Sequence, residues 1–178
     1  MAARQVSLFG IRIHALSLDE AVDLLIALAR DKRPHYVVTP NAHHIVQIRR
    51  DAHLRQIYNN ADVILADGMS IVWASRLLGK PLPERVAGID LLERLCERVS
   101  RNGYRLFLLG AKPGVAVQAA RRLEERYPGL QIVGIHHGYF SVGEEGTVIE
   151  KIKSAAPDVL LVGLGFPKQE LWMSRYAR

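Results

Sequence analysis

Apolar residues along the chain follow two periods that alternate. Short apolar runs, typical of buried strands, are separated by longer stretches in which apolar residues recur at helical spacing. The runs are residues 36–38, 63–66, 105–109, 132–135 and 159–162. Near-continuous Val, Ile and Leu runs between helices are typical of parallel strands covered on both faces. The pattern therefore predicts an α/β, Rossmann-like fold with a mostly parallel sheet and helices on both faces.

The first and middle segments refine this expectation. Residues 6–9 and 11–15 flank Gly10 and predict a short N-terminal β-hairpin. Ser17 and Glu20 have the spacing of a capping box, which predicts the start of a helix. Two prolines within residues 80–83 would end a later helix. We therefore expect residues 1–178 to form one domain, or two lobes with a seam near residues 80–88.

Composition narrows the class of protein. With 178 residues, 49% of them hydrophobic, the chain can bury one sizeable core. The formal charge of +6 comes mostly from scattered arginines, with no aromatic-rich binding motif, so we expect no nucleic-acid partner. The single cysteine, Cys96, lies in a helical pattern and reads as a buried thiol. Neither a signal peptide nor a run of roughly 20 apolar residues is present, which predicts a cytoplasmic protein.

Ligands of parallel sheets bind beyond the carboxyl ends of the strands, so the residues that follow each run are informative. Thr39 and Asn41 follow the first run, on either side of Pro40. Their hydroxyl and amide groups can bond a sugar or a phosphate. Equally, either side chain can cap the helix that follows.

Asp67 and Gly68 follow the second run. A carboxylate at a strand end faces the cleft and can serve as a general base toward a hydroxyl nucleophile. Gly68 allows a substrate or another backbone segment to come close. The alternative is that Asp67 caps the next helix, which is at least as common a role.

Two other loops carry polar side chains with two possible roles each. Arg85 lies between Pro83 and Gly88, where its guanidinium can neutralise a phosphate or remain an exposed surface charge. Gln169 and Glu170 follow the last run at the start of a helix, where they can face a ligand or cap the helix.

The turn after the third run contains Gly110, Lys112 and Gly114. Backbone N–H groups in such a turn can bind a diphosphate at the N-terminus of a helix. The spacing is neither Gly-x-Gly-x-x-Gly nor that of a P-loop, so dinucleotide or ATP binding has weak support. Glycines that simply permit a tight turn are the alternative.

Taken together and in order, four segments resemble the WecG/TagA/CpsF family of bacterial glycosyltransferases. They are Thr39-Pro40-Asn41-Ala42, Ala66-Asp67-Gly68-Met69, Arg85-Val86-Ala87-Gly88-Ile89-Asp90-Leu91 and Gly165-Phe166-Pro167-Lys168-Gln169-Glu170, followed by Trp172. The resemblance implies an inverting transfer of N-acetylmannosamine, or a related hexose or uronic acid, from a UDP donor. The acceptor would be an undecaprenyl-diphosphate-linked glycan in cell-wall or exopolysaccharide synthesis.

By this resemblance Asp67 is the catalytic base. Thr39 and Asn41 would contact donor or acceptor, and Arg85 and Gln169 would be further polar residues of the site. Weaker candidates are Gly68, Gly110, Lys112 and Glu170. The chain contains no Asp-x-Asp triplet, a common metal–diphosphate clamp in other glycosyltransferases, so we expect metal-independent transfer without a cofactor.

One departure from the family is that the chain stops at Arg178 within a helical pattern, without a stop signal. The family normally continues with an Arg-rich tail that helps to bind UDP and the membrane. We therefore expect a truncated chain and, in the whole protein, peripheral contact with the inner face of the cell membrane through that tail. A homo-oligomer is left open. The alternatives are a non-catalytic nucleotide-binding α/β module and a nicotinamide-dependent oxidoreductase, which the missing Gly-x-Gly-x-x-Gly disfavours.

Overall fold

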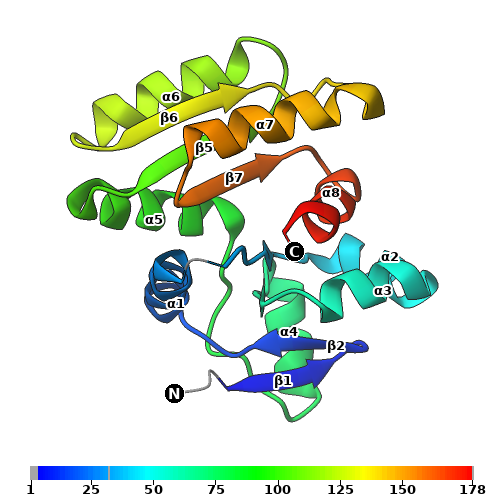
Figure 1. The fold of residues 1–178 in the computed structure, drawn as a ribbon. Coiled ribbons are helices and arrows are strands. Elements are labelled where there is room, and N and C mark those ends of the chain that lie inside the picture. The colour runs from blue at the N-terminus through cyan, green and yellow to red at the C-terminus, as the bar shows by residue number, and fades with distance from the viewer. Residues whose placement is uncertain (1–3, 32, 178) are drawn as a thin grey trace. The chain divides into compact units, whose positions relative to one another are not determined.

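The computed structural model describes residues 4–31 and 33–177, and these fall into two compact units (Figure 1). The first unit contains the described residues up to Arg94 together with those from Phe166 onward. The second runs from Leu95 to Gly165. Helices, parallel strands and an N-terminal hairpin occur in the order that the sequence predicts, so the α/β, Rossmann-like fold is confirmed.

The N-terminal hairpin consists of β1 (Gln5–Leu8) and β2 (Ile11–His14), which pair antiparallel. Alternate side chains are buried from Gln5 to Ile13, as expected for a hairpin with one face on a core, and His14 at the end of β2 is buried as well. His14 joins this hairpin to the next sheet, because its Nδ1 accepts a hydrogen bond from the Ile64 amide at 3.1 Å.

Helix α1 (Leu18–Arg30) begins at the predicted capping box. The Ser17 hydroxyl accepts a hydrogen bond from the Glu20 amide at 3.3 Å, and a Glu20 carboxylate oxygen accepts one from the Ser17 amide at 2.7 Å. Both amides would otherwise lack a partner within the helix, so the pair fixes where α1 starts.

The parallel pair of the first unit is formed by β3 (Val37–Val38) and β4 (Val63–Ile64). Between them lie α2 (Ala42–Arg50) and α3 (Ala52–Asn59), which pack against each other. Backbone pairing continues past both strands, because the Leu65 amide donates to the Val38 carbonyl and the Asp67 amide donates to the Pro40 carbonyl at 2.9 Å. This extension brings the segment around Pro40 beside Asp67.

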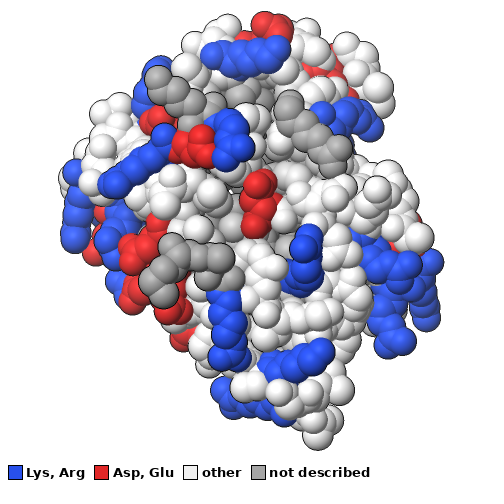
Figure 2. Space-filling model, turned by 60° about the horizontal axis from the view of Figure 1, so that its bottom comes forward, with Lys and Arg blue, Asp and Glu red and all other residues white. Residues whose placement is uncertain are grey.

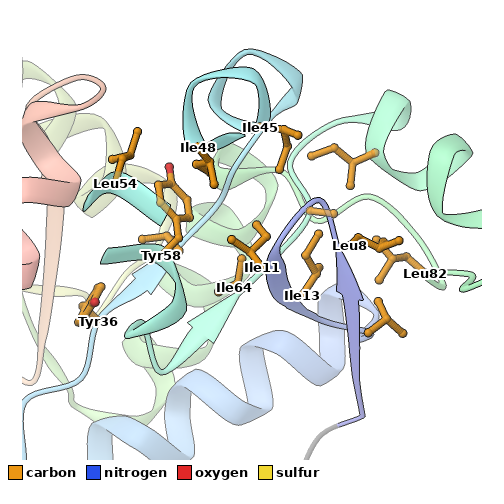
Figure 3. Close-up of a cluster of buried hydrophobic side chains, with 14 residues drawn as sticks. Leu8, Ile11, Ile13, Tyr36, Ile45, Ile48, Leu54, Tyr58, Ile64 and Leu82 are labelled. Carbon is orange, nitrogen blue, oxygen red and sulfur yellow. The ribbon is translucent and has the colours of Figure 1, made fainter. Parts of the chain in front are cut away.

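The core of the first unit lies between the hairpin, the parallel pair and helices α2 and α3 (Figure 3). Ile11, Ile13, Ile48 and Tyr58 are among its fully buried side chains. The unit also contains α4 (Met69–Leu77), the start of α5 (Gly88–Asn102) and α8 (Lys168–Tyr176), which contacts α3.

The second unit is built on a three-stranded parallel sheet of order β6-β5-β7, formed by β6 (Gln131–His136), β5 (Arg105–Gly110) and β7 (Val159–Gly163). Its helices are the end of α5, α6 (Val115–Arg126), the 3₁₀ helix η1 (Val142–Glu144) and α7 (Glu145–Ala155). The central strand is the most deeply buried of the three. Cys96 is buried in α5, as predicted.

In one respect the arrangement differs from a single extended sheet. Among the described residues the parallel strands form two sheets, one in each unit, and the ladder of the first is only two residue pairs long. Its strands are short because helices begin soon after them, at Ala42 and Met69. Within the described part of the chain no helix is both long and apolar enough to cross a membrane.

Candidate active site

Asp67 lies just beyond β4, and its carboxylate faces the N-terminus of α5. Its Oδ2 accepts a hydrogen bond from the Gly88 amide at 3.3 Å. The N-cap of the following helix, α4, is Gly68, and no side chain caps it. The alternative in which Asp67 caps that helix is therefore wrong. The carboxylate is half-buried and held by a backbone donor from a segment 21 residues away.

Thr39 lies beside the same carboxylate. A Cβ atom built on Gly88 would lie 3.5 Å from the Thr39 hydroxyl oxygen and 3.8 Å from Oδ2 of Asp67. Gly88 thus leaves room between a hydroxyl and a carboxylate that come from two neighbouring strand ends. Thr39 and Asp67 therefore both lie next to Gly88.

Asn41 has the capping role that the sequence left open. It is the N-cap of α2, and its Oδ1 accepts a hydrogen bond from the His44 amide at 3.2 Å. A Cβ on Gly68 would lie 3.9 Å from the Asn41 Cβ, so this cap stands next to the Asp67 loop. A contact between the amide of Asn41 and a ligand stays a prediction.

The backbone segment that carries Arg85 is held beside the end of β4. The Val86 amide donates to the Ala66 carbonyl at 2.9 Å, which aligns this segment with the end of β4. The Arg85 guanidinium forms an ion pair with Asp90 at 2.6 Å, and both side chains are well exposed. The loop therefore presents Arg85 as a paired charge rather than a lone one.

Three helices begin around Asp67. Helix α2 starts one residue after Asn41, α4 starts two residues after Asp67, and α5 starts at Gly88. Each helix N-terminus carries a partial positive charge and amide groups without an intrahelical acceptor. Such convergent N-termini favour binding of an anion such as a diphosphate.

Gln169 and Glu170 stand in the first turn of α8, whose N-cap is Pro167. Glu170 is 1% exposed, and its Oε1 accepts hydrogen bonds from Gln169 Nε2 and from the Tyr58 hydroxyl, each at 3.2 Å. The other oxygen, Oε2, is buried without a hydrogen-bond partner among the described residues. Burial raises the pKa of the Glu170 carboxyl above its ordinary value, against the opposing effect of these hydrogen bonds.

His44 connects this buried group with the Asp67 loop. Its Nδ1 lies 3.4 Å from the Tyr58 hydroxyl, and its ring stacks on Phe166 at 4.2 Å between centroids. Burial lowers the pKa of His44, the neighbouring His43 adds to this effect, and the nearby Asp67 carboxylate opposes it. Asp67 is thus close enough to His44 for their charges to interact.

Gly110 and Lys112 belong to the second unit. Gly110 has a steric role there, because a Cβ at this position would overlap the backbone of Gly163 on the adjacent strand. Lys112 is exposed in the turn that precedes α6. Any contact of these two residues with a ligand stays a prediction.

The structure brings together Thr39, Asn41 and Asp67, and it adds residues for which the sequence gave little signal. Tyr58 lies in the apolar pattern of α3 and shows its role only through its contact with Glu170. His44 could be noticed as one of a histidine pair, but its stacking on Phe166 joins residues far apart in the chain. Among the described residues no group of three or more His, Cys, Asp or Glu side chains is placed to hold a metal ion.

The chain is similar to known glycosyl transferases over most of its length. The model of the glycosyl transferase WecG/TagA/CpsF family matches residues 6–178. An N-acetylglucosaminyldiphosphoundecaprenol N-acetyl-beta-D-mannosaminyltransferase of Bacillus spizizenii is 33% identical over 141 residues, which is 79% of this chain and 54% of that protein. A protein of the same name from Staphylococcus aureus is 37% identical over 138 residues, covering 78% and 54% of the two chains. The chain thus spans about half the length of these relatives.

Proposed function

We propose that this chain, which belongs to the WecG/TagA/CpsF family of glycosyl transferases, carries the catalytic base of an inverting sugar transfer. The donor is a UDP-linked N-acetylmannosamine or a related hexose or uronic acid. The acceptor is N-acetylglucosamine on undecaprenyl diphosphate, as in the names of the relatives. The observation that carries the proposal is the Asp67 carboxylate, oriented by the Gly88 amide beside the Thr39 hydroxyl.

The proposed reaction is a direct displacement in which Asp67 is the base. Asp67 takes the proton from an acceptor hydroxyl, and the oxygen of that hydroxyl forms a bond to the anomeric carbon of the donor sugar. The bond from that carbon to the UDP oxygen breaks, and UDP leaves with the electron pair. Attack from the face opposite to the leaving group inverts the configuration.

Negative charge develops on the departing diphosphate and needs positive partners. The N-termini of α2, α4 and α5 supply partial positive charge around Asp67. Arg85 is the candidate side chain, and it would exchange its ion pair with Asp90 for the diphosphate. With these groups to stabilise the diphosphate, the transfer needs no metal ion.

Thr39, Asn41 and Gln169 are proposed to contact the substrates. The Nε2 group of Gln169 donates a hydrogen bond to Glu170. This bond fixes the orientation of the Gln169 side-chain amide and therefore the direction in which its Oε1 points.

Because the acceptor carries a long lipid, the reaction takes place at the inner face of the cell membrane, with which the protein is in peripheral contact.

The test follows release of UDP by the purified chain from UDP-N-acetylmannosamine, with and without a short-chain polyprenyl-diphosphate N-acetylglucosamine acceptor. We expect UDP release that depends on the acceptor and persists in excess EDTA. Loss of turnover in EDTA, restored by Mg²⁺ or Mn²⁺, would contradict the metal-independent part. Binding of the UDP-sugar without acceptor-dependent release would favour a non-catalytic nucleotide-binding module.

A further inference from the structure

Helix α4 has one buried side and one exposed apolar side. Ile71, Val72 and Ser75 are buried against the first unit. On the other side lie three large apolar residues, each four positions from the next: Met69, Trp73 and Leu77, which are 41%, 62% and 89% exposed. Residues four apart share a helix face, so these three form a continuous row, which we call the α4 stripe.

The α4 stripe is unusual for a surface in water. A helix on a globular surface normally turns polar residues outward, whereas here the exposed centre is apolar. From Met69 to Leu77 the row rises about 12 Å along the helix axis. Leu78, directly after the helix, is 54% exposed and extends the apolar surface.

The charges beside the α4 stripe are positive. The helix contains no Asp or Glu, and its one charged residue is Arg76, three positions after Trp73 and exposed. Lys80 follows the helix, and its ammonium group donates to the Ser7 carbonyl at 3.0 Å. Figure 2 brings the bottom of Figure 1 forward, where α4 is labelled, and the lower part of this view carries blue Lys and Arg side chains among uncharged surface, with little red.

The α4 stripe also starts at the candidate active site. Met69 is the first residue of α4 and lies two positions after Asp67. A further exposed apolar residue, Ile89, is 63% exposed and follows Gly88, whose amide holds the Asp67 carboxylate. Exposed apolar side chains therefore occur in two of the segments that surround the proposed base, at the starts of α4 and α5.

We infer that the α4 stripe is a docking surface for an anionic lipid bilayer. The choice of a lipid partner rests on the proposed function, because the proposed acceptor has its polyprenyl chain in a membrane. Apolar side chains enter the boundary between headgroups and acyl chains, Trp73 suits the interface, and Arg76 pairs with lipid phosphates. Docking in this way brings Asp67 close to the membrane surface, where the acceptor diphosphate lies.

A second copy of the chain fits the same surface less well. Two copies related by a two-fold axis would bring like charges, Arg76 of each, to one interface without an acidic partner on α4. Anionic lipid phosphates supply the missing negative charge. Charge therefore favours the bilayer over self-association.

The test is co-sedimentation of the chain with vesicles, either equimolar phosphatidylglycerol and phosphatidylcholine or phosphatidylcholine alone. The vesicles hold neither acceptor nor UDP-sugar, so the result does not depend on turnover. Leu77→Glu places a charge in the α4 stripe at an exposed position. Val142→Glu is the matched control, since Val142 is 80% exposed in η1 of the other unit. Circular dichroism verifies that both variants fold.

We expect the wild type and Val142→Glu to bind the anionic vesicles equally and Leu77→Glu to bind roughly tenfold more weakly. Brominated lipids should quench the fluorescence of Trp73, whereas Trp172, which is 4% exposed, should stay unquenched. Equal binding by Leu77→Glu and Val142→Glu would overturn the inference, as would a wild type that binds neither kind of vesicle. It would also be overturned if Leu77→Glu dissociated a dimer in sedimentation velocity while vesicle binding stayed unchanged.

Discussion

The Gly88 amide donates a hydrogen bond to Oδ2 of Asp67 at 3.3 Å, and this contact joins two loops that the sequence separates by 21 residues. It fixes a carboxylate at the end of β4 against the start of α5. The same glycine leaves space between Asp67 and Thr39, because a Cβ there would contact both side chains at 3.5–3.8 Å. Orientation and space together make this carboxylate suited to accept a proton from a bound hydroxyl.

Replacing Gly88 with Ala tests this space. A methyl group would meet Thr39 and Asp67 at ordinary contact distances, so the free energy of unfolding should change by no more than about 1 kcal/mol. It would nevertheless displace a substrate hydroxyl from the carboxylate, and we expect kcat/KM for UDP release to fall roughly ten- to a hundredfold. Unchanged kcat/KM in a folded variant would show that no substrate occupies this space.

Replacing Gly110 with Ala, unlike replacing Gly88, should lower the stability of the fold. A Cβ there would overlap the Gly163 backbone, and its φ of 142° is one that side chains rarely adopt. Gly110→Ala should therefore lower the free energy of unfolding by at least about 2 kcal/mol in urea denaturation. Gly146→Ala in α7 is the control, because its Cβ meets nothing within 4 Å, and it should be neutral or slightly stabilising. Equal stability of the two variants would refute the steric role.

Local sequence signals predicted the elements of this fold and the strand-end residues. The hairpin turn at Gly10, the capping box at Ser17 and the placement of Asp67 after an apolar run depend on residues close together in the chain. The partners of these residues were less predictable. Tyr58 contacts Glu170 across 112 residues, and Gly88 contacts Asp67 across 21. Such contacts arise from tertiary packing, which single-residue patterns do not encode.

Glu170 should make stability fall as the pH rises. Burial raises the pKa of the Glu170 carboxyl above its ordinary value of 4.5. At pH values between 4.5 and the raised pKa, the folded state therefore holds the proton more tightly than the unfolded chain does. Stability is then lost as the pH rises through this range. Glu170→Gln cannot ionise, and its unfolding free energy relative to wild type should increase over the same range.

The measurement for Glu170 is urea denaturation at a series of pH values from about 4 upward. Glu150→Gln is the matched control, because the Glu150 side chain is 71% exposed and forms a surface ion pair with Lys153. A constant difference between Glu170→Gln and wild type at every pH would rule out an ionisation cost at this site.

His14 should have the opposite effect at mildly acidic pH. Burial lowers the pKa of His14 below 6.5, and the nearby Arg12 charge adds to this effect. The folded state therefore binds the proton less tightly, so this stability is present above pH 6.5 and lost as the pH falls toward the lowered pKa. His14→Asn keeps an acceptor for the Ile64 amide without titrating, and its stability should decline less on acidification.

This comparison uses His53→Asn as the control, since His53 is exposed on α3. Thermal denaturation between pH 7 and pH 5 should give a shallower decline in Tm for His14→Asn than for wild type and His53→Asn. Parallel declines in all three proteins would contradict the assignment to His14. His44, whose pKa is also lowered by burial, should account for part of the decline that remains.

The central claim is that Asp67 removes a proton from the acceptor hydroxyl. Its most direct test is acceptor-dependent UDP release by Asp67→Asn, with Glu150→Gln as a control for the loss of one carboxylate. Asn has nearly the same shape but cannot take the proton, so we expect kcat to fall roughly 10²- to 10⁴-fold while the donor still binds. Release of UDP by Asp67→Asn at the wild-type rate would contradict the account.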